Sequence, residues 1–466
     1  MLFSSIPFLY YFLAGVIILY FAVPVNLKNI VLLMSSLFFY AWGEVRYVVL
    51  MIAVIVLGYI FGLIVAKSTS QKQKKFFLAV SVITFVGILG YFKYADFFVS
   101  NFNAVTGLQI PLLKVALPIG ISFYTFQVMS YVVDVYRGDT KVQYNPFTLA
   151  TYVSMFPQLI AGPIVRYADV AEQLGHRVHS VDKAALGIRR FVIGLSKKIL
   201  IANALGELCE IFKASGDKSV AFYWLYAVAF TLHIYYDFSG YSDMAIGLGK
   251  IFGFDLLENF NYPYISGSIT EFWRRWHMSL GTWFRDYVYI PLGGNRVSKP
   301  RWLFNIFVVW FLTGFWHGAS WNFIIWGLYF AVILMLEKLV LLPVLQKSGA
   351  FKHIYVLFLV IISFVIFNAA DMTEAFNYIG GMFGSGGIAV LSPEAVYYFK
   401  SNLVVLLIAI VGATPICKRL VNRLEASPKG AAIVGILEPM ALIILMLLCT
   451  AYLVDGSFNP FLYFRF

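Results

Sequence analysis

The residue in the most unusual chemical setting is His317, which follows Trp316 inside a long apolar stretch. No Asp, Glu, Lys or Arg lies between Trp302 and Met335. A titratable side chain is costly among apolar residues of a membrane segment, and one that is kept there is by default a candidate for function. Burial favours the neutral imidazole, which could take a proton from a hydroxyl as a general base. The alternative is a hydrogen-bonded structural histidine, and the local pattern leaves both open.

A second histidine, His277, lies in an aromatic and basic run from Glu271 to Asp286. On a helix, its large apolar residues share one face and its charged residues the other, which predicts an amphipathic helix at the cytoplasmic interface. His277 falls at the margin of the apolar face. We therefore expect it to point toward the same interior as His317, although it could instead only anchor the helix.

Polar residues also interrupt the apolar sequence between Tyr235 and Lys250. Asp237 and Asp243 lie there among tyrosines, serines and glycines, a composition that is typical of a cavity lining inside a membrane protein. A helix break at Gly240, with Asp243 capping the next helix, is an equal alternative. His233, in the preceding apolar run, is a weaker site candidate.

The amino-acid composition indicates whether the elements that position these residues are surrounded by water or by lipid. Of 466 residues, 61% are hydrophobic, 18% are aromatic and only 12% are charged. This predicts an all-α polytopic integral membrane protein with about 11 true spans, together with re-entrant and interfacial helices. The apolar segments are Ile6–Pro24, Asn29–Trp42, Tyr47–Ala66, Phe76–Phe98, Leu112–Tyr136, Phe147–Pro163, Phe191–Gly206, Ala221–Phe238, Trp302–Phe315, Trp321–Leu342, Ile354–Ala370, Leu403–Ile416 and Ala431–Val454.

The net charge of +12 is explained by membrane topology better than by nucleic-acid binding. Cytoplasmic loops of membrane proteins carry an excess of Lys and Arg. We therefore expect Asn101–Pro111 and Asp371–Glu394 to lie outside the cytoplasm. The basic segments, which we expect on the cytoplasmic side, are Lys67–Lys75, Arg166–Arg190, Arg274–Arg301 and Lys418–Lys429.

Two other features of the sequence bear on the site. The segment Ser154–Pro163 has prolines at positions 157 and 163, which break helix continuity and favour a re-entrant segment over a full span. Cys209, Cys417 and Cys449 are far apart and lack metal-ligand spacing. We therefore expect no metal site and no disulfide framework.

These residues match a known family. The chain resembles the membrane-bound O-acyltransferases, and specifically the bacterial branch typified by the alginate O-acetylation membrane protein. Three motifs carry the resemblance, namely Trp316-His-Gly-Ala-Ser-Trp321, Trp273-Arg-Arg-Trp-His-Met-Ser-Leu280 and Tyr236-Asp-Phe-Ser-Gly-Tyr-Ser-Asp243. Further matches from end to end are Met1–Ser5, Pro118–Gln127, Gly162–Arg166, Tyr289–Arg296 and Phe458–Phe464.

The resemblance implies one membrane-embedded domain over residues 1–466, with N-terminal helices in 1–136, a catalytic core in 137–342 and C-terminal helices in 343–466. Its helices would enclose a tunnel, with His317 at the midpoint and His277 toward the cytoplasmic entrance. Both histidines would be catalytic. The residues expected to bind the donor or substrate are Asp237, Tyr236, Tyr241, Arg274, Arg275, Trp316 and Trp276.

The implied reaction moves an acyl group, expected to be acetyl, across the membrane. The donor would be acetyl-CoA or another cytoplasmic thioester, used as co-substrate, with no cofactor bound. The acceptor would be a hydroxyl of an exported polysaccharide or cell-envelope polymer, reached with the help of an extracytoplasmic acyltransferase or esterase-like partner. The protein would lie in the bacterial cytoplasmic membrane and would bind no nucleic acid.

Each role has an alternative. Asp237 could orient His277, while Arg274 and Arg275 could attract the phosphates of the coenzyme or only bind lipid headgroups. The alternative function is a transporter or flippase of a lipid-linked sugar with the histidines in a proton relay. Inverted repeats would favour a transporter, and the sequence shows none. A purely structural scaffold is a third reading.

Overall fold

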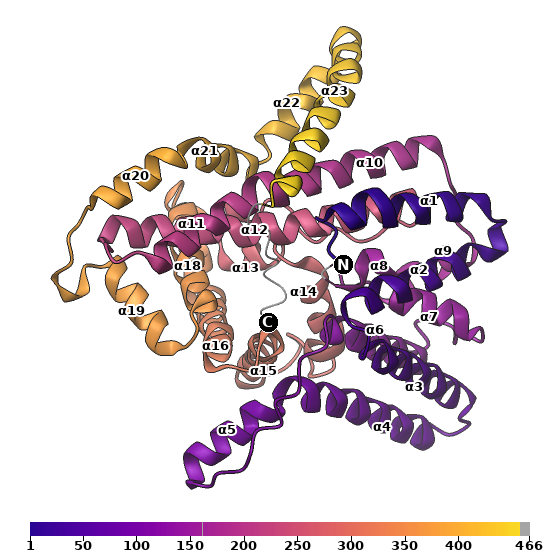
Figure 1. The fold of residues 1–466 in the computed structure, drawn as a ribbon. Helices are drawn as coiled ribbons and strands as arrows, with labels where there is room; N and C mark the ends of the chain where they lie inside the picture. Colours follow the sequence, from indigo (N-terminus) through magenta and orange to yellow (C-terminus); the bar gives the residue numbers. More distant parts are fainter. Residues whose placement is uncertain (161, 457–466) are drawn as a thin grey trace. The chain divides into compact units, whose positions relative to one another are not determined.

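The computed structural model describes residues 1–160 and 162–456, and the regular elements in these ranges are all helical. This confirms the all-α fold (Figure 1). Six described helices are long and apolar enough to cross a membrane, or seven if the bent pair Pro393–Ser401 and Leu403–Gly412 is one span. The count of about 11 spans stays a prediction, because several apolar segments form short or interrupted helices.

The described chain divides into two compact units. The first consists of Met1–Phe191 and Met244–Leu257, and the second of Val192–Asp243 and Glu258–Phe466. Two of the three boundaries fall inside helices, α10 (Val181–Ser196) and α12 (Val220–Ile251), and the third lies between Leu257 and Glu258, outside any helix. Both candidate histidines and Asp237 belong to the second unit. The division of the chain into 1–136, 137–342 and 343–466 stays a prediction.

The first unit contains the long helices α2 (Lys28–Gly43), α3 (Val48–Lys67), α4 (Gln71–Leu89) and α6 (Ile121–Arg137). The remaining helices of this unit are α1 (Leu13–Ala22), α5 (Ala95–Thr106), α7 (Pro146–Ser154), α8 (Phe156–Leu159) and α9 (Tyr167–Gly175).

Two predicted spans of the first unit differ from the structure. The segment Leu112–Tyr136 becomes helical only at Ile121, after a left-handed Gly120 with φ of 74°. Phe147–Pro163 is not one helix, because α7 ends at Ser154 and Met155 leaves helical geometry with ψ of 110°. The interruption that the prolines predicted is present, although Ala161 lies outside the described residues. The membrane side on which this segment lies stays a prediction.

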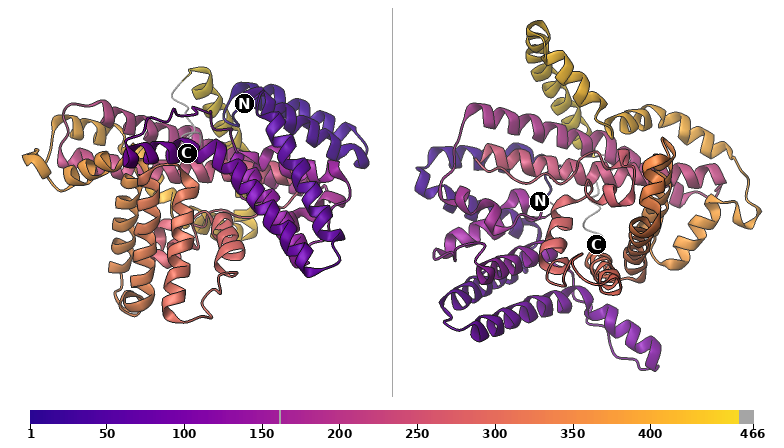
Figure 2. Two further views of the ribbon diagram at one scale, coloured as in Figure 1. Left: turned by 90° about the horizontal axis from the view of Figure 1, so that it is seen from below. Right: turned by 180° about the vertical axis from the view of Figure 1, so that it is seen from behind.

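The second unit is built on α11 (Asn203–Ala214), α12, α15 (Lys299–His317), α16 (Trp321–Leu336) and α18 (Phe351–Asn368). Helices α15, α16 and α18 run side by side (Figure 2). Its other helices are α13 (Ile269–Trp273), α14 (Met278–Phe284), α17 (Leu342–Lys347), α19 (Met372–Met382), α20 (Pro393–Ser401), α21 (Leu403–Gly412), α22 (Ile416–Glu425) and α23 (Pro428–Val454).

A glycine pair brings the helix that ends at His317 close to its neighbour. A Cβ atom on Gly314 of α15 would overlap the carbonyl oxygen of Phe323, and one on Gly327 of α16 would overlap that of Trp310. Small residues are what allow two membrane helices to approach this closely. The pair therefore sets the distance between α15 and α16 just before His317.

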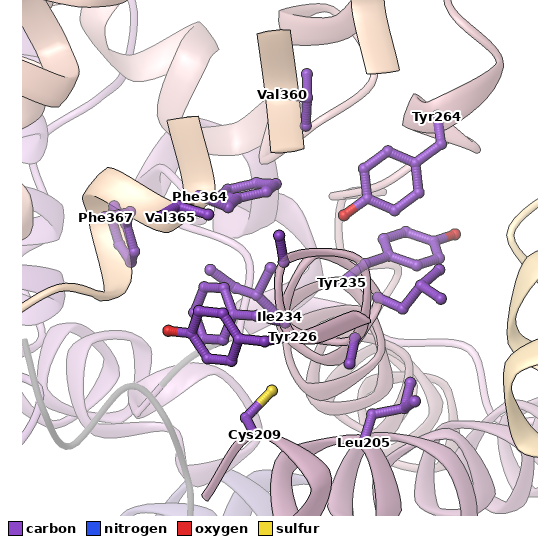
Figure 3. Packing of buried hydrophobic residues seen from close by; sticks show 14 of the residues in the cluster. Leu205, Cys209, Tyr226, Ile234, Tyr235, Tyr264, Val360, Phe364, Val365 and Phe367 are labelled. Atoms are coloured by element: carbon purple, nitrogen blue, oxygen red, sulfur yellow. The ribbon is translucent and has the colours of Figure 1, made fainter. Parts of the chain in front are cut away.

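The core of the second unit is largely aromatic. Figure 3 shows side chains of α12 packed with those of α11 and α18. The labelled members of this cluster are Leu205, Cys209, Tyr226, Ile234, Tyr235, Tyr264, Val360, Phe364, Val365 and Phe367. This packing fixes α18 against α12, and α18 supplies one wall of the site described below.

One alternative and one prediction for the second unit are wrong. Helix α12 continues through Gly240 without a break, so Asp243 caps no helix there. Gly240 instead allows a close approach, since a Cβ atom on it would lie 2.7 Å from the carbonyl oxygen of Gly194. The predicted amphipathic helix over Glu271–Asp286 is also not continuous, because α13 ends at Trp273 and α14 begins at Met278.

Candidate active site

His317 is the last residue of α15 and lies in an aromatic enclosure. Its ring centroid is 5.0 Å from that of Trp316, 5.0 Å from that of Trp326 and 5.3 Å from that of Phe367, and all three contacts are edge to face. The residue is only 7% exposed. The imidazole therefore lies in a largely apolar environment, as the sequence predicted.

The walls of this enclosure come from helices that are tied together by a buried asparagine. Asn322, in the first turn of α16, donates from Nδ2 to the carbonyl oxygen of Ala369 at 2.9 Å and to that of Phe367 at 3.4 Å. Its own side chain is 1% exposed. A hydrogen bond to backbone carbonyls at the end of α18 is strong in such a dry setting, so Asn322 holds Phe367 in place against His317.

His277 also contacts Trp316. The His277 and Trp316 ring centroids are 6.1 Å apart, and the ring of Phe238 from α12 is 4.6 Å from His277. His277 is 2% exposed. The structure thus places both histidines against one tryptophan, in the shared interior that the sequence predicted.

The backbone at His277 explains why the predicted long helix is interrupted. His277 has φ of 44° and ψ of 53°, a left-handed conformation that is uncommon for a residue other than glycine. Backbone groups next to His277 hydrogen-bond to the segment before α13 instead of to a continuous helix. Asn261 N–H donates to Arg275 O and Met278 N–H donates to Asn259 O, both at 2.9 Å. Periodicity does not reveal such long-range partners.

The side chain of Asn259 also contacts the histidine. Its Oδ1 lies 3.1 Å from His277 Nδ1 and accepts a hydrogen bond from Ser279 Oγ at 2.9 Å. Burial lowers the pKa of His277 from 6.5 to about 3, so this ring is neutral at physiological pH. The sequence offered Asp237 as one residue that could orient His277, whereas the residue hydrogen-bonded to His277 Nδ1 is Asn259.

Asp237 instead forms a buried ion pair with Lys198. Lys198 Nζ lies 2.5 Å from Asp237 Oδ1, and the two side chains are 2% and 1% exposed. Asp243 pairs with Lys197 at 2.7 Å, but these two side chains are only partly buried. Removing one partner of a buried pair leaves an uncompensated charge, which is strongly destabilising. Next to this pair, His233 Nδ1 lies 2.6 Å from the carbonyl oxygen of Ala202.

A buried glutamate that sequence reasoning missed positions α13. Glu337 is fully buried, and its carboxylate accepts hydrogen bonds from the backbone N–H groups of Ile269 at 2.6 Å and Thr270 at 2.8 Å. The hydroxyl of Thr270 adds a third at 2.7 Å. The carboxylate satisfies donors that the helix itself leaves without partners. A signal existed in the sequence, since Glu337 is the acidic residue inside the apolar segment Trp321–Leu342.

The other expected binding residues are placed as follows. Tyr236 donates to the carbonyl oxygen of Ala409 at 2.6 Å, and Tyr241 is buried on the same helix. Trp276 stacks on Phe272, with ring centroids 5.6 Å apart. Their binding roles stay predictions.

The two arginines differ from each other. Arg275 forms an ion pair with Glu271 at 2.9 Å, whereas Arg274 is exposed. Arg274 is therefore the better placed of the two to meet an anion from solution.

Comparison with known proteins decides the family. The model of the membrane-bound O-acyltransferase family matches residues 137–370, which include His277 and His317. The chain belongs to this family. It is 38% identical over 499 residues to the protein named "Probable alginate O-acetylase AlgI" of Azotobacter vinelandii, with all of both chains covered.

Two further relatives show the range of this family. The peptidoglycan O-acetyltransferase of Helicobacter pylori is 34% identical over 440 residues, which is 85% of this chain and 82% of the relative. The teichoic acid D-alanyltransferase of Bacillus subtilis is 32% identical over 228 residues, which is 46% of this chain and 58% of the relative. This membrane-bound O-acyltransferase is therefore an enzyme of the AlgI-like branch, and it spans the membrane several times.

Proposed function

We propose that this enzyme transfers an acetyl group from a cytoplasmic thioester to a hydroxyl of an exported polysaccharide or cell-envelope polymer, through a tunnel with His317 at its midpoint. The observation that carries the proposal is the buried His317 in its aromatic enclosure, within a chain matched from end to end by a protein named for alginate O-acetylation. The D-alanyltransferase matches less than half of the chain, which favours acetyl over D-alanyl as the group transferred.

The proposed chemistry begins with the acceptor hydroxyl. As its oxygen attacks the carbonyl carbon of the thioester, neutral His317 takes the hydroxyl proton. The tetrahedral intermediate then expels the thiolate by breaking the carbon–sulfur bond, and the imidazolium returns the proton to sulfur. The products are an ester and a free thiol. General-base assistance of this kind accelerates a reaction roughly 10²- to 10⁴-fold, and the apolar walls exclude water that would otherwise hydrolyse the donor.

A covalent route is the alternative form of the same function. His317 would attack the thioester itself, hold the acyl group on its ring and pass it to the hydroxyl in a second step. Both routes need a neutral imidazole in a dry site. Both also predict that loss of His317 removes the activity.

The remaining expected partners follow from the same proposal. The exposed Arg274 would attract the phosphates of acetyl-CoA, which acts as co-substrate with no bound cofactor. The enzyme would reside in the bacterial cytoplasmic membrane and would work with an extracytoplasmic acyltransferase or esterase-like partner. Membership of the acyltransferase family favours this function over the transporter of a lipid-linked sugar.

Transfer of a labelled acyl group separates these two functions. We expect membranes that contain the enzyme to move label from [¹⁴C]acetyl-CoA to the envelope polymer fraction of the producing cell, with release of one free thiol for each ester formed. Membranes without the enzyme provide the control. A transporter would leave the label on the thioester, and that result would overturn the proposal.

A further inference from the structure

Asn259 hydrogen-bonds to His277 and to the two residues that follow it. It precedes α13 and is 1% exposed. Its side-chain oxygen meets His277 Nδ1 at 3.1 Å, Ser279 Oγ at 2.9 Å and the backbone N–H of Ser279 at 3.3 Å. Its backbone oxygen accepts from Met278 N–H at 2.9 Å. One residue therefore holds the chain immediately after His277 as well as the ring itself.

The backbone contact settles which way the amide of Asn259 is turned. The N–H of Ser279 can only donate, so the atom that it meets must be the carbonyl oxygen Oδ1 rather than the nitrogen. An amide oxygen carries no hydrogen and can only accept. The hydrogen in its contact with His277 must then lie on Nδ1 of the ring.

The protonation of Nδ1 determines what the rest of the ring can do. A neutral imidazole has one N–H nitrogen and one nitrogen with a lone pair. Since burial keeps His277 neutral and Nδ1 carries the hydrogen, Nε2 is the nitrogen with the lone pair. His277 can accept a hydrogen bond at Nε2 but cannot donate one there, so in this state it cannot polarise a thioester carbonyl through Nε2.

Two energetically unfavourable features, one at His277 and one at Asn259, indicate that this arrangement does more than fill space. His277 holds a left-handed backbone conformation, and such strain persists only where the surroundings over-determine it, often at functional sites. Among the residues that the structure describes, Asn259 Nδ2 has no hydrogen-bond partner although it is buried. Burying an unpaired N–H group is unfavourable. A leucine would fill a similar volume without that cost.

We propose that Asn259 is a positioning residue that fixes the Nδ1–H tautomer of His277 and so makes Nε2 the nitrogen that accepts a hydrogen bond when an O–H or N–H group of a substrate enters the site. This inference rests on the proposed acyl transfer and adds to it a residue and a direction of hydrogen bonding. His277 then orients a substrate donor group beside Trp316, and His317 remains the base that removes the proton.

The tautomer can be measured without any assay of activity. Protein labelled with [¹⁵N]histidine contains only six histidines, and the signals of His277 are those lost in the spectrum of His277→Gln. We expect a protonated Nδ1 and an unprotonated Nε2 for His277 at pH 7.5. A protonated Nε2 in the wild-type protein would overturn the assignment, whatever the enzyme does with acyl donors.

Three variants test the part played by Asn259. Asn259→Leu removes the acceptor at similar volume, and we expect it to lose the pure Nδ1–H signal and at least tenfold in kcat. Asn259→Asp keeps an oxygen in place and should retain the Nδ1 proton. Ser279→Ala is the matched control, because it removes the Ser279 hydroxyl from the same Asn259 oxygen and leaves the His277 contact, so it should keep the tautomer.

Each outcome leads to a different conclusion. An unchanged tautomer in Asn259→Leu would overturn the positioning role, and so would a changed tautomer with unchanged kcat. If Asn259→Leu fails to fold, the wild-type and Asn259→Asp spectra still decide, since a loss of the Nδ1 proton in Asn259→Asp contradicts the proposal. If the tautomer responds as expected but the wild-type protein transfers no acyl group, the proposed function fails while the tautomer assignment stands.

Discussion

Replacing His317 by glutamine is expected to lower the rate of acyl transfer by roughly 10²- to 10⁴-fold. Glutamine keeps a hydrogen-bonding side chain of similar reach but supplies no useful basicity. His317→Ala should be equally inactive, because both variants remove the base. Initial rates of transfer from labelled acetyl-CoA measure the effect, and they must be normalised to the amount of protein in the membrane.

Folding must be separated from chemistry in this experiment. His317 lies at the end of α15 beside Trp326 and Phe367, so its loss affects packing locally but leaves the apolar spans intact. The variants should therefore reach the membrane and elute as the wild type does in gel filtration. His176→Ala serves as the control, since His176 is exposed. More than a few per cent of wild-type turnover in His317→Gln would mean that His317 is not the base.

His277→Asn is expected to raise KM for the thioester or to abolish turnover while the protein remains folded. Asparagine is the informative substitution, because it adopts the left-handed conformation of His277 more readily than most residues. The loss then reports on the ring and its Nε2 rather than on the backbone. Steady-state kinetics with varied acetyl-CoA, together with thermal unfolding of the same preparation, measure the two effects separately.

His277→Ala provides a second substitution at this position. It also removes the ring but fits the left-handed backbone less well than asparagine, so we expect the same kinetic defect with a lower melting temperature. Unchanged kinetics in both variants, with a lowered melting temperature in His277→Ala, would leave His277 with a structural role alone.

The residue types and their apolar context were enough to predict that His317 and His277 point into the protein interior. A lone imidazole among apolar residues marks His317, and an aromatic face on a short amphipathic stretch marks His277. The structure brings both to Trp316. These features are local in sequence. Burying a polar group costs free energy whether its partners are near or far along the chain, so the cost can be inferred without knowing the partners. That is why composition and periodicity were informative here.

The partners of the buried polar groups could not be predicted in the same way. Asp237 stood out as a buried acid, but its cation Lys198 lies 39 positions earlier, and the asparagine at His277 Nδ1 lies 18 positions before that residue. Such pairs depend on which helices pack together. The interruption of the predicted helix at His277 has the same origin, because backbone groups of residues 259 and 261 take the place of helical hydrogen bonds.

Hydropathy alone could not determine how many of the apolar segments span the membrane. Apolar segments such as Phe147–Pro163 are rich enough to suggest a span, yet the structure divides that one into two short helices. A short apolar helix buried within the protein and a true span have similar compositions. Length and continuity in three dimensions separate them.

The central claim is that the acyl group crosses the membrane through the enzyme. The membrane face at which the thioester donor is consumed tests this claim most directly. If an acyl group alone crosses the membrane, the thioester must be consumed at the face of the Lys/Arg-rich loops and the acceptor must be acylated at the opposite face. A coenzyme with several phosphates does not cross hydrocarbon. Sealed vesicles of known orientation can therefore be supplied with [¹⁴C]acetyl-CoA from one side only, with the acceptor polymer on the other.

We expect inside-out vesicles, in which the basic loops are predicted to face the medium, to label the enclosed acceptor from external acetyl-CoA. Right-side-out vesicles supplied in the same way should remain unlabelled. An entrapped dye reports leakage, and vesicles that carry His317→Gln give the background. Equal labelling from either face without leakage would contradict the tunnel and would place His317 in a one-sided active site.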